Sequence, residues 1–140
     1  RYTVRTLFQG MHYTITTRYY AGWQVDLVDM KGIIHVLIED AFPADYEQLH
    51  HELVDALNLR DCEAVGVIWY QRKDKKVYIN PVVWVRNVDT LYYESACGSG
   101  AIAASVCTSC NDIVQPTGQS IYVLIDKVRI TTECEVAIIS

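Results

Sequence analysis

The chain has 140 residues, of which 51% are hydrophobic and 21% charged, and its formal net charge is −5. This length suits one domain with one core, and the hydrophobic share is too high for a disordered chain. The acidic balance argues against nucleic acid, which binds clustered Lys and Arg. No apolar run reaches the roughly 18 residues that a membrane helix needs. We therefore expect a single domain over residues 1–140 that binds neither nucleic acid nor a membrane.

The start of the chain and its cysteines bear on its origin. Arg1 stands where Met would be expected, within a predicted strand and without a signal-peptide pattern, which indicates a piece of a longer protein. The five cysteines are an odd number, atypical of a secreted disulfide scaffold, so we expect a reducing compartment, with the cytoplasm as the default. Cys107 and Cys110 have CxxC spacing, but suitable zinc partners are missing and the pair falls near the end of a predicted helix. We interpret them as small buried residues.

The first third of the chain predicts four strands. Residues 1–8 and 11–19 alternate in polarity, with Gln9-Gly10 as a hairpin turn between them. Residues 23–29 alternate again, and residues 33–39 are apolar enough for a central strand.

A change of period then marks a helix. Its apolar stripe recurs at three and four residues, at Tyr46, Leu49, Leu53 and Leu57. Asp45, followed three residues later by Gln48, resembles a capping box. His50 and His51 lie on this helix beside acidic residues, and we interpret them as exposed rather than as metal ligands because they form no i, i+4 pair.

The rest of the chain predicts strands and a second helix. The expected elements are a hairpin of 64–71 and 77–86, a short strand at 91–93, a helix over 101–110, a long strand or hairpin over 121–132, and a last strand at 136–139. Pro81 predicts an edge or a bulge in the hairpin. Mostly antiparallel strands with two helices make an α+β domain.

The segment from Ala96 to Ala101, with the sequence ACGSGA, carries the strongest chemical signal. It places Cys97 at the N-terminus of the second helix, where free N–H groups and the helix dipole favour a thiolate. The N–H groups of Gly98, Ser99 and Gly100 form an anion site there. A reactive sulfur beside a carboxylate site suits removal of the α-proton of an amino acid. Racemisation needs an acid and a base on opposite faces of Cα, so one such Cys is half of a catalytic pair.

At this motif the sequence resembles the family of diaminopimelate epimerases and proline racemases. That family has two pseudo-symmetric α+β halves, each with a catalytic Cys, and uses neither a cofactor nor a metal. The ACGSGA segment is similar to the motif of the family's C-terminal half, and the Cys-Gly-Asn-Gly motif of its N-terminal half does not occur in this chain. The resemblance covers most of residues 23–139.

The resemblance implies a C-terminal half, with mostly antiparallel strands wrapped around a central helix. It implies that Cys97 is catalytic and that the substrate is a free amino acid. The partner would be the missing N-terminal half of the same protein, and a homodimer is left open.

Departures from the family pattern bear on the substrate. Ile33 and Ile34 replace the Asn and Pro of the family's Gly-Asn-Pro-His segment, and the family's lead-in to the Cys is absent. These changes argue against diaminopimelate. The Glu94-x-x-Cys97 stretch looks closer to the histidine racemases of opine-metallophore synthesis. We therefore assign Glu94 to substrate binding with Gly98, Ser99 and Gly100, and interpret His35 as a core residue or a support of the site.

Two alternatives stay open. An isomerase similar to those of phenazine biosynthesis works with an acidic residue instead of paired cysteines, so Cys97 argues against it. An isolated domain whose glycine-rich loop holds an anion would show no activity. In that case Cys97 is a small residue in a turn that the glycines shape, and Glu94 is an exposed strand residue.

Overall fold

The computed structural model describes the backbone of residues 2–9, 13–125 and 129–136 and the side chains of residues 13–124. These residues form ten strands, two α-helices and one 3-10 helix. In chain order the elements are β1 (Tyr2–Gln9), β2 (Tyr13–Tyr20), β3 (Trp23–Met30), β4 (Ile33–Glu39), α1 (Tyr46–Ala56), β5 (Ala64–Lys73), β6 (Lys76–Val85), η1 (Arg86–Val88), β7 (Thr90–Tyr93), α2 (Gly98–Thr108), β8 (Asp112–Val114), β9 (Ser120–Ile125) and β10 (Arg129–Val136).

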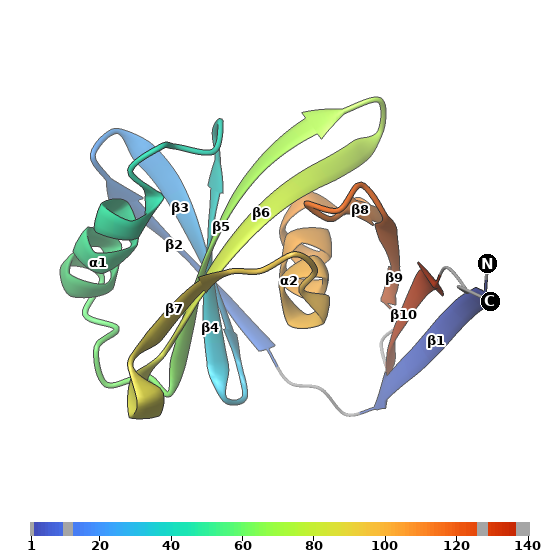
Figure 1. Cartoon of the computed structure of the whole chain (residues 1–140), viewed down its shortest axis with the longest axis horizontal. Coiled ribbons are helices and arrows are strands. Elements are labelled where there is room, and N and C mark those ends of the chain that lie inside the picture. The colour runs from blue at the N-terminus through green and yellow to red at the C-terminus, as the bar shows by residue number, and fades with distance from the viewer. Residues whose placement is uncertain (1, 10–12, 126–128, 137–140) are drawn as a thin grey trace.

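The strands form one sheet, of which β4, β5 and β6 lie between α1 and α2, whereas β8, β9 and β10 lie on the far side of α2 (Figure 1). Their order is β1-β10-β9-β8-β6-β5-β4-β3-β2, and β7 also pairs with β6. The pairs β4–β5 and β6–β8 are parallel and the other pairs are antiparallel. The helix α2 contacts β4, β6, β8, β9 and β10. The predicted α+β fold with two helices is confirmed.

Each face of the sheet carries a hydrophobic cluster. Leu37 and Ile68 pack with α2, whereas their neighbours Val36 and Val67 pack with α1. Successive strand residues point to opposite faces, so a strand covered on both sides must be apolar throughout. This explains the continuous apolar sequence of β4 and confirms its central position.

The predicted hairpin of the first two strands is wrong. β1 pairs with β10, with Tyr2 opposite Val136, and β2 pairs with β3. The two strands therefore lie at opposite ends of the sheet order. Alternating polarity marks a strand but does not identify its partner, and Gly10 of the expected turn lies outside the described residues, as do Arg1 and Met11.

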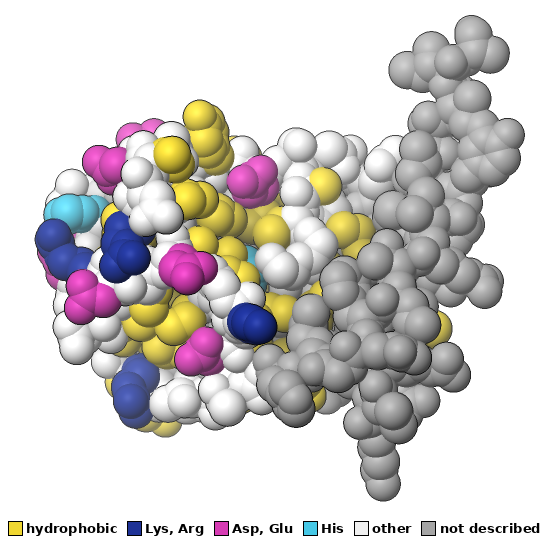
Figure 2. All heavy atoms as spheres, turned by 90° about the horizontal axis from the view of Figure 1, so that it is seen from below, with side chains coloured by type: hydrophobic (Ala, Val, Ile, Leu, Met, Phe, Trp, Pro, Cys, Tyr) yellow, Lys and Arg dark blue, Asp and Glu magenta, His cyan; other side chains and the backbone are white. Residues whose placement is uncertain are grey.

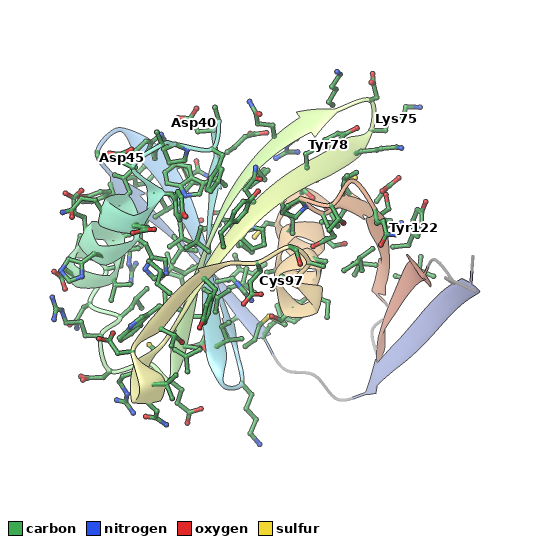
Figure 3. The ribbon with its side chains drawn as sticks, viewed as in Figure 1. Asp40, Asp45, Lys75, Tyr78, Cys97 and Tyr122 are labelled. Atoms are coloured by element: carbon green, nitrogen blue, oxygen red, sulfur yellow. The ribbon has the colours of Figure 1, made fainter. Side chains whose placement is uncertain are left out.

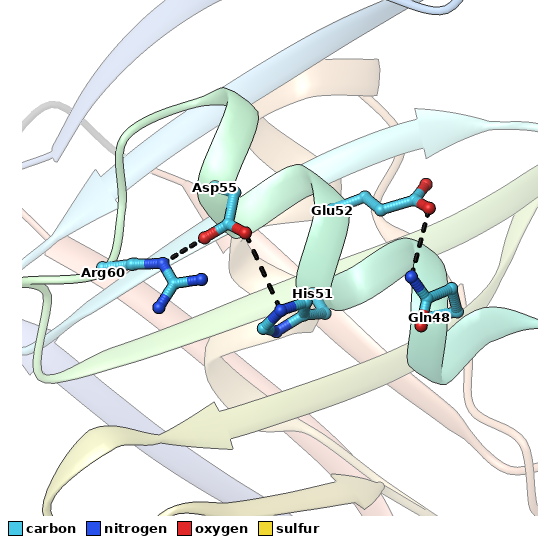
Figure 4. Close-up of polar contacts among 5 residues, drawn as sticks. All are labelled: Gln48, His51, Glu52, Asp55 and Arg60. Atoms are coloured by element: carbon cyan, nitrogen blue, oxygen red, sulfur yellow. Dashed lines mark hydrogen bonds and ion pairs between the residues drawn. The ribbon is translucent and has the colours of Figure 1, made fainter.

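The apolar stripe of α1 is confirmed, but its predicted capping box is wrong. Asp45 makes no capping hydrogen bond with its side chain. The amide Nε2 of Gln48 donates instead to Oε1 of Glu52 at 3.2 Å (Figure 4).

The two histidines of α1 differ in environment. His51 is exposed, as predicted, and lies 3.7 Å from Asp55, which also pairs with Arg60 (Figure 4). His50 is only 3% exposed, and its Nε2 lies 3.0 Å from the carbonyl oxygen of Val65. The prediction that His50 is exposed is wrong because its position, three residues before Leu53, belongs to the buried stripe.

The predicted hairpin of β5 and β6 is confirmed, and Pro81 lies inside the sheet rather than at its edge. Strand β6 pairs with β8 through Val77 and Tyr78, and with β7 from Val82 to Val85. Pro81 lies between these two segments, where β6 changes its neighbour, so its missing N–H leaves no ladder bond broken. Its carbonyl accepts a hydrogen bond from the N–H of Glu94 at 2.9 Å.

The short strand at 91–93 is confirmed as β7, and the segment 121–132 is a hairpin of β9 and β10. Of the last predicted strand, 136–139, only Val136 is described. Cys107 lies in the last turn of α2 and Cys110 follows it; both are free and half-buried rather than buried.

Part of the hydrophobic surface is open to solvent in the described chain, where it lies among acidic and basic groups (Figure 2). Tyr92 and Tyr93 of β7 are 60% and 42% exposed, and they lie directly before the segment that leads to Cys97. Within the described residues, no helix combines the length and the apolar character needed to cross a membrane.

Candidate active site

Cys97 lies at the point where the chain from β7 enters α2 (Figure 3). It is the N-cap residue, with an extended backbone (φ −139°, ψ 109°), and its carbonyl accepts the first helical hydrogen bond from Ala101 at 3.0 Å. The predicted position of this Cys at the helix N-terminus is confirmed. The helix begins at Gly98, three residues before the predicted start, because the glycines form its first turn.

The thiol and the backbone of Cys97 are both held by hydrogen bonds. The Sγ atom accepts from the N–H of Gly100 at 3.3 Å and lies 3.7 Å from Oγ of Ser99. The backbone N–H of Cys97 donates to Oε1 of Gln115 at 2.9 Å. Gln115 is 3% exposed, and its own amide donates to the carbonyl of Ile113 at 3.2 Å. Gln115 was not predicted as a site residue, because no motif or spacing distinguishes it.

The predicted anion site at the start of α2 is smaller than expected. The N–H of Gly100 is used by the sulfur of Cys97, which leaves the N–H groups of Gly98 and Ser99 without a partner among the described residues. An added Cβ at Gly100 would lie 3.0 Å from both Cys97 Sγ and Ile68 Cδ1, so close packing requires this glycine. An added Cβ at Gly98 would meet nothing within 4 Å. Gly98 and Ser99 thus present the available backbone donors.

His35 supports this helix start from the core. Its side chain is fully buried, and its Nε2 lies 2.8 Å from Oγ of Ser99. Its Nδ1 is also buried and has no hydrogen-bond partner among the described residues. Burial lowers the pKa of His35 from 6.5 to about 4, so the ring is neutral at physiological pH. The interpretation of His35 as a core residue is confirmed.

Gly66 provides the space that the His35 ring occupies. The two residues are partners in the ladder of β4 and β5. An added Cβ at Gly66 would lie 2.7 Å from Cε1 of His35 and closer still to Nδ1. Gly66 was not predicted as part of the site, although a glycine inside a strand pattern is itself a signal of close approach.

The electrostatic environment of Cys97 differs from the expectation. Burial raises the pKa of the thiol, and the charge of Glu94 raises it further, whereas the hydrogen bonds from Gly100 and Ser99 lower it. Burial has the largest effect, so the helix N-terminus does not by itself produce a stable thiolate in this domain. Cys97 is therefore protonated at rest, and the hydrogen bonds from Gly100 and Ser99 favour its thiolate.

Three pockets of the described chain lie elsewhere. One of about 490 Å³ adjoins the β5–β6 turn, one of about 470 Å³ lies between α1 and β6, and one of about 300 Å³ adjoins the β3–β4 turn. None of these three includes Cys97. Among the described residues, no cluster of three or more His, Cys, Asp or Glu side chains could hold a metal ion.

A comparison with protein families gives a match over most of the chain. A family model described as the histidine racemase CntK N-terminal domain matches residues 7–135. No curated protein matches the sequence significantly. The model describes an N-terminal domain, so the predicted C-terminal half and the likeness to diaminopimelate epimerases are not confirmed. In the family that the sequence resembles, the two halves are pseudo-symmetric, which makes a cysteine motif alone a poor guide to the half.

Proposed function

Because this domain belongs to the family of histidine racemase CntK N-terminal domains, we propose that it forms half of the active site of a racemase that acts on histidine. Cys97 exchanges the α-proton on one face of the substrate. A thiol from another domain of the same protein serves the opposite face.

The observation that carries this proposal is the position of Cys97 beside two free backbone donors. The N–H groups of Gly98 and Ser99 are available for a carboxylate at the N-terminus of α2, where the helix dipole also favours negative charge. Negative charge grows on that carboxylate as the α-proton leaves, because the carbanion resembles an enediolate. Donors fixed in advance stabilise this charge more strongly than the ground state.

The reaction is balanced without any further reagent. From the resting state the Cys97 thiol donates its proton to Cα and becomes a thiolate, while the opposite sulfur, as a thiolate, takes the α-proton and becomes a thiol. In the other direction the two roles are exchanged, and the Cys97 thiolate takes the α-proton. The configuration at Cα is inverted, and the reverse reaction returns both sulfur atoms to their first state. Glu94, three residues before Cys97, contributes to substrate binding in this proposal.

The test measures proton exchange in the complete protein that contains this domain. L-histidine is incubated in D₂O, the loss of its α-proton signal is followed by NMR, and D-histidine is measured by chiral chromatography. Cys97→Ser should lower the exchange rate roughly 100- to 10,000-fold, the range of a positioned acid or base. Full exchange in this variant would contradict the mechanism.

Cys107→Ser is the matched control, because Cys107 is a free, half-buried thiol of the same helix outside the candidate site. It should retain the exchange rate within about twofold. Parallel assays with L-proline and diaminopimelate separate the activity from its substrate. Exchange on one of these, but not on histidine, would overturn the assigned substrate and leave the racemase proposal intact.

A further inference from the structure

We propose that His35 and Ser99 form a hydrogen-bond chain of fixed direction that donates to the thiolate of Cys97, which makes His35 a positioning residue. Its importance in catalysis rests on the proposed function. The chain itself consists of described residues and can be tested without turnover.

The chain runs from the core of the domain to the sulfur. His35 Nε2 and Ser99 Oγ are 2.8 Å apart, which is a normal hydrogen bond, and Ser99 Oγ and Cys97 Sγ are 3.7 Å apart. A hydroxyl has one proton to donate and two lone pairs to accept with. Ser99 can therefore accept from one neighbour and donate to the other.

The surroundings of His35 determine the direction of the chain. Its Nδ1 is buried without a partner, whereas Nε2 faces the Ser99 hydroxyl. A buried N–H without an acceptor is rarer in proteins than an acceptor without a donor. We therefore infer that Nδ1 carries the lone pair and Nε2 carries the proton. His35 then donates to Ser99, and the hydroxyl proton of Ser99 is left to donate to the sulfur.

This direction excludes His35 as the base for the thiol. Its Nε2 already carries a proton, and a second proton on Nδ1 would create a charge inside the core. The low pKa of about 4 has the same cause. His35 thus fixes the orientation of Ser99 and does not take the proton of Cys97.

The chain acts against two unfavourable effects on the thiolate. Burial and the carboxylate of Glu94 both raise the pKa of Cys97, whereas the hydrogen bonds from Ser99 and Gly100 lower it. The Gly100 donor belongs to the backbone and no side-chain substitution removes it. Among the described side chains, Ser99 donates to the sulfur and His35 holds Ser99 in place, so these two side chains favour the thiolate.

The experiment follows the alkylation of Cys97 by iodoacetamide against pH in the complete protein, measured on the Cys97 peptide by mass spectrometry. Hydrogen bonds to a charged group are strong enough that Ser99→Ala should slow alkylation at pH 8 roughly tenfold and move the midpoint to higher pH. His35→Leu should slow alkylation roughly three- to tenfold, because the unanchored hydroxyl can turn away. His35→Gln should restore the rate to within about twofold, because its amide N–H can still donate to Ser99.

Two controls separate this effect from a loss of packing. Ser105→Ala removes another buried hydroxyl of α2, one that has no partner among the described residues, and His50→Gln replaces a buried histidine on the opposite face of the sheet. Both should leave Cys97 alkylation within about twofold of the original. An unchanged profile in Ser99→Ala, or equal profiles in His35→Leu and His35→Gln, would overturn the chain. Alkylation needs no turnover, so this outcome is independent of the racemase test.

Discussion

A glycine inside β5 makes room for the imidazole on which the candidate site depends. His35 and Gly66 belong to one row across the sheet, which continues through Val83 to Tyr92. The row connects the buried histidine with the exposed tyrosine of β7, on the face that α2 covers. A substitution at Gly66 would therefore act on Ser99 by displacing the His35 ring, which is hydrogen-bonded to Ser99 Oγ.

Gly66→Ala should destabilise the domain by about 1–3 kcal/mol, because the added Cβ overlaps the His35 ring in a packed core. Urea unfolding gives the free energy of unfolding directly. Gly98→Ala is the matched control, since an added Cβ there meets nothing within 4 Å, and we expect a change below about 0.5 kcal/mol. Equal stability of the two variants would show that the His35 ring can move aside.

At the scale of elements, the turn between β5 and β6 is the clearest case of local strain. Asp74 and Lys75 have φ of 53° and 63°, the left-handed conformation that both central residues of a type I′ turn adopt. Such turns match the twist of the strands that they join, and glycine is the preferred second residue. The hairpin thus retains a favourable turn geometry with an unfavourable residue at Lys75.

Lys75→Gly should stabilise the domain by about 0.5–1 kcal/mol, because glycine adopts this conformation without a clash at Cβ. The change is measured as the shift of the urea midpoint. Lys73→Gly serves as the control, since Lys73 is exposed and lies in β5 proper, where glycine should lower stability by a similar amount. A loss of stability in Lys75→Gly would show that the turn geometry is not limiting.

Elements that depend on local periodicity were predictable from the sequence, whereas their partners were not. The apolar stripe of α1 and the apolar run of β4 were predicted correctly, because the spacing of apolar residues within a short segment distinguishes a helix from a strand. The pairing of β1 with β10 and the contact of Gln115 with Cys97 join distant segments, and nothing local encodes them. The ACGSGA motif identified Cys97, but its pKa depends on burial, which the motif does not contain.

At the scale of the whole molecule, buried histidines make stability depend on pH. The pKa of His35 falls from 6.5 to about 4 on folding, and burial also lowers the pKa of His50. Between pH 6.5 and pH 4 the unfolded chain binds a proton at His35 that the folded chain does not bind. The contribution of neutral His35 to the free energy of unfolding is therefore fully present above pH 6.5. It is lost as the pH falls from 6.5 to about 4.

We expect the free energy of unfolding to fall by about 3 kcal/mol between pH 7 and pH 4 from His35 alone, with His50 acting in the same direction. Urea unfolding at a series of pH values measures this slope. In His35→Gln the free energy of unfolding should fall less between pH 7 and pH 4, because glutamine does not titrate and the contribution of His35 is removed. A slope that is identical in this variant would contradict the neutral buried state of His35.

The pairing of β1 with β10 has a consequence for synthesis on the ribosome. Among the described residues β10 is the sole partner of β1, so β1 leaves the ribosome long before the strand that completes its hydrogen bonds. Closing so long a loop is slow, and an unpaired strand can meanwhile pair with another nascent chain. We expect the sheet from β2 to β6 to form first and β1 to dock last. The domain should therefore need protection by chaperones late in its synthesis, after the Cys97 segment has already emerged.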